Sequence, residues 1–400
     1  MRSNSSPGQE ATVRPDAVRR QVWTWIVACA VAAAAGAVRA AEPGPTVGGL
    51  VWTDARQLVV EGRGWTDTRE FFDRLPARAE GRVRAPVWRL SRDSAGLAVR
   101  FVTDAPTLHA RWTLRREQLA RPHVSATGTS GLDLYRRDED GEWRWLAATG
   151  STGFPANTAV LVRALPAKKR EYLLYLPLYN GIASLELAVP RGHEILPAPP
   201  RPPGKARPVV FYGTSVTQGQ AASRSGMVHT AILGRRLDRP VINLGFSGNG
   251  KMEPELAELL AELDPAVFVL DCVPNMTGPE LAVRVEPFVH RLRAQHPATP
   301  IVLVEDRTYA GEFWLADRGG ANRERRAALA AVYARLQAAG VPGLHYLPGD
   351  GLIGDDGDGT IDGSHLTDLG FYRQALGFEA VLAGLLAAEE RAFSSPVSTP

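Results

Sequence analysis

The sequence predicts an α/β protein in which a doubly wound parallel sheet follows an antiparallel β-sandwich. Three observations lead to this prediction. Short alternating apolar runs fill residues 45–195, unbroken apolar runs alternate with helical patterns over 209–390, and the proline-rich stretch 196–208 separates them. Alternation indicates strands with one buried face, whereas continuous apolar runs indicate strands covered on both faces. The chain has 400 residues, of which 44% are hydrophobic, so it is long enough for two domains of ordinary size.

Residues 1–40 have the pattern of an export signal. Arg19 and Arg20 precede an apolar run from Val22 to Ala37, and the small residues of Val38–Ala40 suit the cleavage positions −3 and −1. This run is shorter than the roughly 20 residues that span a bilayer. We expect cleavage, no stable membrane span afterwards, and a periplasmic or secreted protein. A single-pass anchor is the alternative.

Charge and cysteine content exclude several classes of function. The net charge of +3 is accounted for by residues 1–40, where five arginines stand against Glu10 and Asp16, so the remainder of the chain is neutral. A neutral body without a basic run argues against nucleic-acid binding. Cys29 lies in the predicted signal, which leaves Cys272 alone in the mature chain. An intrachain disulfide is therefore excluded, and no Cys/His spacing indicates zinc.

Residues 45–195 are predicted to form the β-sandwich. Short apolar or alternating runs recur there, and Gly, Pro, Asp and Asn turn signals separate them, as is typical of antiparallel sandwiches. The expected strands include 87–90, 97–102, 108–112, 172–176 and 184–189.

Residues 196–208, LPAPPRPPGKARP, are predicted to be an extended connector, because proline fixes φ and has no donor N–H. Beyond it, strands alternate with helices, which predicts a five-stranded, flavodoxin-like parallel sheet with helices on both faces. The expected strands are 209–212, 241–244, 267–270, 301–304 and 344–347, and the expected helices include 253–263, 280–294 and 323–339. Residues 391–400 are expected to form a tail.

Candidate reactive groups follow three of these strands, at the sheet edge where active sites of such folds gather. Gly213–Ser215 follows the first strand, 245–250 (GFSGNG) the second, and Asn275 comes shortly after the third. A glycine turn presents a serine hydroxyl, and glycines let backbone N–H groups point at a ligand. Each segment also has a structural alternative: a helix N-cap, a flexible turn or anion nest, and a capping asparagine.

Asp362 and His365 complete the candidate set. A serine nucleophile needs a base, and the base needs an orienting acid. An aspartate three residues before a histidine can reach Nδ1, which leaves Nε2 free to accept the serine proton; of the eight histidines, only His365 has this neighbour. The nearby stretch 355–360 superficially resembles a calcium loop but lacks its glycine and glutamate positions, so no metal is expected.

Together these segments resemble the SGNH (GDSL-type) hydrolases, a family named after four residues. The family's blocks fall on Ser215, Gly248, Asn275 and His365. The match covers about residues 205–390, with Asp362 preceding the histidine. Two departures are a Gly-Thr-Ser block in place of Gly-Asp-Ser and Leu366 where proline is frequent. Neither removes a functional group.

The front half resembles a second family. Gly131–Tyr135 matches the GxDLY signature of a domain found upstream of such hydrolases, and Ser130, 176–181 and 243–253 look similar to flanking phrases. The structural alternative is an ordinary strand with a turn glycine.

The resemblance implies a serine esterase that needs no metal or organic cofactor. Ser215 would attack an ester carbonyl, His365 would take its proton, and Asp362 would hold the imidazole. The backbone N–H groups of Ser215 and Gly248 and the side chain of Asn275 would meet the oxyanion.

The expected partner is a small acylated substrate, and a β-sandwich on an exported enzyme favours an acetylated saccharide. A lipase or platelet-activating-factor-type acylhydrolase is the alternative, and a catalytically inert carbohydrate-binding protein is a further one. Arg307, Tyr309 and Trp314 follow the fourth strand and either contact substrate or pack a loop. The tryptophans of the sandwich are expected to be core residues first and sugar platforms second: Trp52, Trp65, Trp88, Trp112, Trp143 and Trp145.

Overall fold

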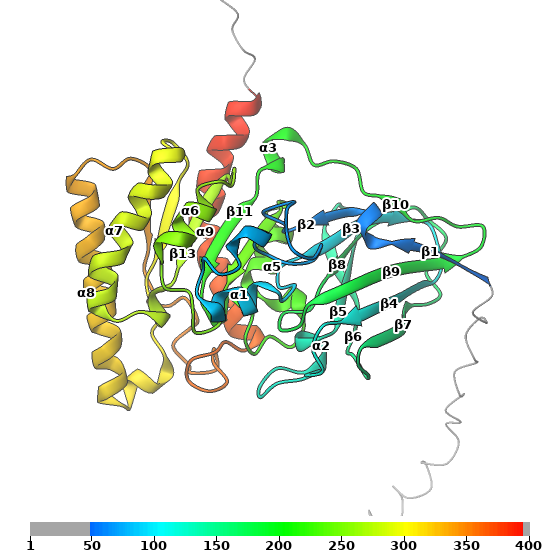
Figure 1. Cartoon of the computed structure of the whole chain (residues 1–400), viewed down its shortest axis with the longest axis horizontal. Coiled ribbons are helices and arrows are strands. Elements are labelled where there is room, and N and C mark those ends of the chain that lie inside the picture. The colour runs from blue at the N-terminus through cyan, green and yellow to red at the C-terminus, as the bar shows by residue number, and fades with distance from the viewer. Residues whose placement is uncertain (1–48, 395–400) are drawn as a thin grey trace, which may run out of the picture. The chain divides into compact units, whose positions relative to one another are not determined.

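Two antiparallel sheets form from the front half of the chain (Figure 1). The structure is a computed structural model that describes residues 49–394, so the predicted signal peptide 1–40 and most of the predicted tail lie outside the described residues. One sheet has the order β1-β9-β4-β7, with β1 (Leu50–Asp54), β9 (Ile182–Pro190), β4 (Leu108–Leu114) and β7 (Ala156–Val162). The other has the order β10-β3-β8-β5-β6, with β2 beside β3: β2 (Val59–Glu61), β3 (Ala98–Thr103), β5 (Leu132–Arg137), β6 (Trp143–Thr149), β8 (Arg170–Tyr175) and β10 (Leu196–Pro197).

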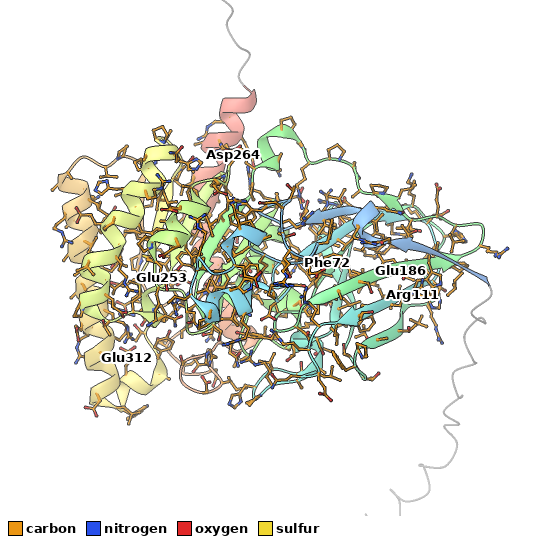
Figure 2. The ribbon with its side chains drawn as sticks, in the orientation of Figure 1. Phe72, Arg111, Glu186, Glu253, Asp264 and Glu312 are labelled. Carbon is orange, nitrogen blue, oxygen red and sulfur yellow. The ribbon has the colours of Figure 1, made fainter. Side chains whose placement is uncertain are left out.

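The two sheets enclose one apolar core, which confirms the predicted sandwich. Alternate residues of each strand, such as Val99 and Phe101 in β3 and Leu185 in β9, are buried in this core. The side chains between them face outward. Figure 2 shows such a pair, in which Arg111 of β4 donates to Glu186 of β9 at 2.7 Å.

One predicted strand is wrong. Residues 87–90 lie in a helix, α1 (Ala85–Ser91), which has proline in its first turn. A short apolar run cannot distinguish a buried strand from a helix segment, and a proline at the start favours the helix. Val87 is buried against the parallel sheet, in a cluster that contains Val210, rather than in the sandwich core. The other helices of the front half are η2 (Ala55–Gln57), η3 (Ala77–Ala79) and α2 (Ala126–Thr129).

The proline-rich connector is less uniformly extended than predicted. Its first two residues form β10, which pairs with Phe101 and Val102 of β3, and Pro203–Ala206 form a helical turn, α3. Proline is tolerated on an edge strand and in the first turn of a helix, which explains both elements.

The second half contains the predicted parallel sheet, and the fold class is confirmed. The sheet has the order β12-β11-β13-β14-β15. Its strands are β11 (Val209–Gly213), β12 (Val241–Gly245), β13 (Val267–Asp271), β14 (Ile301–Val304) and β15 (Leu344–Leu347). The helices are α4 (Ser215–Gln218), η4 (Ser225–Met227), α5 (His229–Arg236), α6 (Pro254–Leu260), η5 (Val273–Asn275), α7 (Gly278–Gln295), η6 (Ala310–Phe313), α8 (Ala316–Ala338) and α9 (Asp368–Ser394).

Both faces of this sheet are covered, which is why its strands are apolar throughout. Val210 and Tyr212 of β11 pack with α6, α7 and α8, whereas Val209 and Phe211 pack with α5 and α9. In Figure 1, α7 and α8 lie on the side away from the sandwich and α5 lies toward it. Among the described residues, none of the helices combines the length and the apolar character required to cross a membrane.

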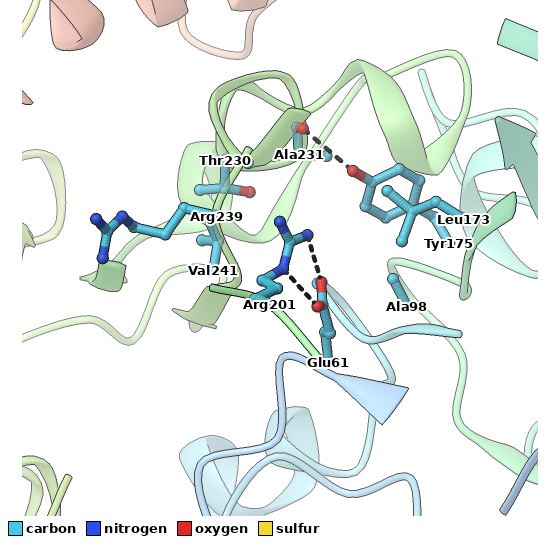
Figure 3. A pocket seen from close by; sticks show the side chains of 11 residues that line it. Glu61, Ala98, Leu173, Tyr175, Arg201, Thr230, Ala231, Arg239 and Val241 are labelled. Carbon is cyan, nitrogen blue, oxygen red and sulfur yellow. Dashed lines mark hydrogen bonds and ion pairs between the residues drawn. The ribbon is translucent and has the colours of Figure 1, made fainter. Parts of the chain in front are cut away.

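The sandwich packs directly on the parallel-sheet half, and residues 50–394 belong to one compact unit. The outer face of the β10-β3-β8-β5-β6 sheet contacts α5, where Tyr175 donates its hydroxyl hydrogen to the Ala231 carbonyl at 3.2 Å. Figure 3 shows this seam, which encloses a cavity of about 30 Å³ and the ion pair between Arg201 and Glu61. Such a volume holds one or two water molecules, so the contact is close.

Candidate active site

Ser215 stands directly beyond the carboxyl end of β11. Thr214 caps the following helix by accepting the Val216 N–H at 3.3 Å, so Ser215 is the first residue of α4. A Cβ at Gly213 would lie only 2.0 Å from Thr217 Oγ1, and therefore only glycine lets the strand turn this tightly into the helix. Ser215 is 9% exposed, so its side chain is largely covered by neighbouring groups.

His365 and Asp362 meet this hydroxyl. The distance from His365 Nε2 to Ser215 Oγ is 3.0 Å, and that from His365 Nδ1 to Asp362 Oδ2 is 2.7 Å. The other carboxylate oxygen accepts the backbone N–H groups of Ser364 and His365, at 3.0 and 2.8 Å. Burial alone would raise the pKa of Asp362, but these hydrogen bonds lower it below its usual value, so the carboxylate is charged at neutral pH. The three side chains form a relay with the distances that acyl transfer needs.

The loop that carries His365 is braced from α9. Arg373 donates to both carboxylate oxygens of Asp356, at 2.8 and 2.7 Å, and this pairing lowers the pKa of Asp356 to about 2. The Ile361 N–H donates to the His365 carbonyl at 2.9 Å. In the stretch that resembled a calcium loop, Asp356 therefore pairs with an arginine.

The turn after β12 presents Gly248. The N–H groups of Asn249 and Gly250 both donate to the Phe246 carbonyl, at 2.7 and 3.1 Å, and Gly248 has a φ of +71°. This left-handed conformation suits glycine. A Cβ on Gly250 would lie 2.1 Å from the Gly213 carbonyl oxygen, so the turn sits against the strand that leads to the serine.

Three donors on the segments that follow β11, β12 and β13 have no hydrogen-bond partner in the described part of the chain. Two are the backbone N–H groups of Ser215 and Gly248. The third is the side-chain amide of Asn275 in η5: its Oδ1 accepts the Gly250 N–H at 3.3 Å, which leaves Nδ2 as the donor. Such a group of donors can stabilise negative charge that develops on an oxygen.

Gln218, which no motif in the sequence predicted as a site residue, connects these groups. Its Oε1 accepts the Ser247 N–H at 3.0 Å, and its Nε2 donates to Asp93 Oδ2 at 3.0 Å and to the Leu178 carbonyl at 3.1 Å. Gln218 is 0% exposed, so these bonds are not shared with solvent. One signal was available, because Gln218 is three residues after Ser215 on one helical turn, but nothing in the sequence pointed to Asp93.

A second buried contact comes from the front half. Arg74 is 1% exposed and donates to the carbonyls of Asn243 and Gly245, at 3.0 and 2.8 Å, at the end of β12. Burial lowers the pKa of Arg74 to about 10, which leaves it charged at neutral pH. Tyr179, from the phrase 176–181, donates to the Ser215 carbonyl at 3.5 Å. The front half thus supports the backbone of the serine and glycine blocks.

Arg307 was expected to contact substrate or to pack a loop, and its position contradicts the first expectation. It is 0% exposed, and its guanidinium donates to both oxygens of Asp271, at 2.7 and 2.6 Å, and to Gln374 at 2.6 Å. Asp271 holds the pKa of Arg307 above its usual value despite burial. Tyr309 is also buried and donates to Asp306 at 2.9 Å. Trp314 differs, because it is 86% exposed.

Two residues of the GxDLY signature, Asp133 and Tyr135, contact the parallel-sheet half. Asp133 of β5 is fully buried, and its Oδ2 accepts the Gly226 N–H at 2.7 Å and Arg224 at 2.9 Å. The Tyr135 hydroxyl accepts from the same Arg224 at 2.5 Å. A Cβ on Gly131 would lie 2.1 Å from the Thr149 carbonyl oxygen, which explains the signature's glycine. The signature therefore joins the two halves.

Comparisons with known proteins agree with the resemblance. Residues 206–383 match the model of the GDSL-like lipase/acylhydrolase family, and residues 50–195 match GxDLY, described as the N-terminus of SGNH-hydrolase-type esterases. No curated protein sequence matched the chain. A GDSL-like lipase structure from Bacteroides ovatus is 33% identical with a TM-score of 0.79, and the match covers 84% of this chain and 98% of that one.

Two further solved structures share the fold at lower identity. Salicylyl-acyltransferase SsfX3 from a tetracycline biosynthetic pathway is 18% identical with a TM-score of 0.68, over 84% of this chain and 97% of that one. A family two carbohydrate esterase from Cellvibrio japonicus is 15% identical with a TM-score of 0.55, over 84% of this chain and 98% of that one.

Proposed function

The chain belongs to the GDSL-like lipase/acylhydrolase family and is a serine ester hydrolase, and from this premise we propose that it removes short acyl groups, acetyl above all, from carbohydrate esters. The observation that carries the proposal is the relay from Ser215 through His365 to Asp362, with distances of 3.0 and 2.7 Å. The predicted export signal 1–40 supports action in the periplasm or outside the cell.

The relay supports a two-step acyl transfer. Ser215 Oγ attacks the ester carbonyl while His365 Nε2 takes the hydroxyl proton, and Asp362 stabilises the resulting imidazolium. The oxyanion of the tetrahedral intermediate accepts from the N–H groups of Ser215 and Gly248 and from Asn275 Nδ2. The intermediate collapses, the sugar alkoxide leaves with the proton from His365, and an acyl-Ser215 remains. Water then attacks with His365 as base, which releases the carboxylic acid and the free serine.

The proposed substrate class rests on fold-level likeness and on the predicted export. The Cellvibrio japonicus relative is a carbohydrate esterase, and a family two carbohydrate esterase from Clostridium thermocellum, 14% identical with a TM-score of 0.51, was solved in complex with cellohexaose. A lipase or platelet-activating-factor-type acylhydrolase is the second candidate, because the matching family model covers lipases as well.

Acyl-chain profiling and a Ser215→Ala variant test the proposal. We expect the wild-type protein to release acetate from acetylated oligosaccharides, with rates that fall sharply beyond acetyl and propionyl esters. Ser215→Ala should lower kcat by about 10³-fold or more, because the nucleophile is gone while the oxyanion donors remain. Full turnover by Ser215→Ala would eliminate the relay, and rates that rise toward long acyl chains would favour the lipase.

A further inference from the structure

A pocket at the seam between the sandwich and α5 carries an exposed tryptophan on its wall. The pocket has a volume of about 340 Å³, which is within the range of small-molecule sites. Residues of β5 and β6 line one side, and residues of η4, α5 and α9 line the other. Two large exposed aromatic side chains face it, Trp145 at 53% and Tyr372 at 43% exposure.

Two contacts hold the Trp145 ring in place. Its Nε1–H donates to Asp133 Oδ1 at 3.1 Å, and the Arg224 guanidinium lies over one face, with Cζ at 5.1 Å from the ring centroid. Asp133 is fully buried and Arg224 is paired with it, so both supports are fixed. The exposed area therefore belongs to the rest of the ring, and an apolar ligand face that stacks there loses little side-chain entropy.

The ion pairs of the pocket's arginines indicate the charge of the ligand that it suits. Three of its arginines have carboxylate partners: Arg144 with Asp138, Arg224 with Asp133 and Arg236 with Glu379. Arg235 lies over the Tyr135 ring at 3.9 Å, and Glu142 on the opposite side supplies a negative charge. The lining is thus close to neutral, with polar groups around aromatic faces. A polyanion would require several unpaired cations, whereas a neutral sugar presents both a C–H face and hydroxyl groups.

Two segments that line the pocket follow candidate catalytic residues in the sequence. Ser223, next to Arg224, donates its N–H and hydroxyl to the two carboxylate oxygens of Asp368, at 3.0 and 2.5 Å. Asp368 begins α9 three residues after His365, and Tyr372 lies about 6 Å further along that helix. The loop that follows Ser215 and the segment that follows His365 therefore both lead into this pocket.

We propose that the pocket is an accessory subsite for a neutral saccharide unit, which stacks on Trp145 while another unit of the same oligosaccharide presents its acyl ester to Ser215. This inference rests on the proposed function and names a site for the sugar chain. Asp133 of the GxDLY signature would then have two roles, because it joins the two halves of the molecule and orients the Trp145 ring.

Binding and kinetics of the full-length mature protein test the subsite. Titration calorimetry with neutral cellohexaose, xylohexaose and mannohexaose should detect at least one ligand, and Trp145→Ala should weaken that binding about tenfold. On an acetylated hexasaccharide, Trp145→Ala should raise KM with little change in kcat. Its loss of kcat/KM there should exceed its loss on p-nitrophenyl acetate by about tenfold, because the small ester does not reach the pocket.

Two further variants keep the test decisive. Trp52 on β1 also has an arginine over its ring, with Arg111 Cζ at 4.2 Å, but lies outside this pocket, so Trp52→Ala is the matched control and should bind as wild type. Tyr372→Ala alters an exposed helix position and should weaken binding even if Trp145→Ala folds poorly. Circular dichroism checks each variant's fold.

The outcomes separate this inference from the proposed function. Deacetylation of the hexasaccharide with equal KM in wild type, Trp145→Ala and Tyr372→Ala would overturn the subsite and leave the esterase standing. If the protein bound saccharides through Trp145 but had no esterase activity, the proposed function would be overturned and the subsite would stand. Preference for an acidic hexasaccharide such as oligogalacturonate would overturn the assignment to neutral sugars.

Discussion

At the scale of single residues, Gln218 connects the helix of the candidate nucleophile, Ser215, with the turn that carries a candidate oxyanion donor. It lies on the helical turn that Ser215 begins, and its Oε1 accepts the Ser247 N–H at 3.0 Å. Its Nε2 has two buried acceptors, so both ends of the amide are satisfied. The glycine turn is thereby attached to the serine helix by a side chain of that helix, and preorganised donors of this kind cost no rearrangement during reaction.

Asn275 provides the sharpest residue-scale prediction. In the wild-type protein Asn275 Oδ1 accepts the Gly250 N–H at 3.3 Å. Asn275→Asp keeps an oxygen at this position but replaces the Nδ2 donor with a second oxygen. We expect kcat to fall by about 10²–10³-fold or more, because one oxyanion donor is lost and a negative charge is placed near the developing one. Steady-state kinetics on p-nitrophenyl acetate, with the Tm as a check of folding, measures this.

Asn275→Ala serves as the comparison, because it removes donor and acceptor without adding charge. It should lose less kcat than Asn275→Asp but more thermal stability, since the Gly250 N–H then keeps only the Phe246 carbonyl as acceptor. Wild-type kcat in both variants would show that Asn275 does not contact the oxyanion.

At the scale of elements, one buried ion pair joins the segments that carry the candidate site. Asp271 ends β13, Arg307 follows β14, and their bidentate contact is 0% exposed on both sides. Asp271 also accepts from Thr217 of α4 at 3.2 Å, and Arg307 donates to Gln374 of α9 at 2.6 Å. The pair therefore connects the helix of Ser215 with the helix that follows His365, and neither of its residues belongs to the relay.

We predict strong coupling between these two residues. Arg307→Met alone leaves a buried carboxylate without a cation and should reduce the free energy of unfolding by about 3–5 kcal/mol. Asp271→Asn with Arg307→Met should recover part of that loss, because no uncompensated charge remains. Urea unfolding of both single variants and the double variant gives the coupling energy, and additive effects would contradict the connection.

The same scale shows what the sequence could predict. All five parallel strands were expected within a residue or so of their positions, because strands buried on both faces are continuously apolar, as Val267–Asp271 is. The serine, glycine and asparagine blocks each follow one of these strands in the structure, as their order in the sequence predicted. The segment 87–90 was misassigned as a strand because four apolar-rich residues fit a strand and a helix equally, and only its packing on the parallel sheet decides.

Contacts between distant segments explain what sequence reasoning missed. Gln218 and Asp93 are 125 residues apart, and no spacing or motif relates them. Arg307 stood beside aromatic residues after a strand, which is equally consistent with a substrate contact and with a buried pair. Its burial follows from Asp271, a charged residue at the end of an apolar strand, and that partner was the available signal.

At the scale of the whole molecule, the contact between the two halves contributes to folding and to the site. The front half supplies Arg74 and Tyr179 to the backbone of the candidate site, and Asp133 and Tyr135 to the segment around Gly226. A free-standing binding module would need few such contacts. We infer that the sandwich is required for the folded active protein.

Gly226 is the position at which this inference can be tested with one methyl group. A Cβ there would lie 2.4 Å from Tyr135 Cε2 and 2.7 Å from Asp133 Oδ2, so Gly226→Ala forces the two halves apart locally. We expect it to destabilise the protein by about 1–3 kcal/mol, and to lower esterase activity together with the Tm. Gly320→Ala is the matched control, because a Cβ at Gly320 would have no atom within 4 Å. Gly320 lies inside α8, and alanine is favoured over glycine within a helix by roughly 0.5–1 kcal/mol. Differential scanning calorimetry measures the Tm of both variants. A Gly226→Ala variant with the wild-type Tm, beside a Gly320→Ala variant whose Tm is equal to or higher than that of the wild type, would contradict the inference. The contact between the halves would then tolerate movement, and the sandwich would be a loosely attached module.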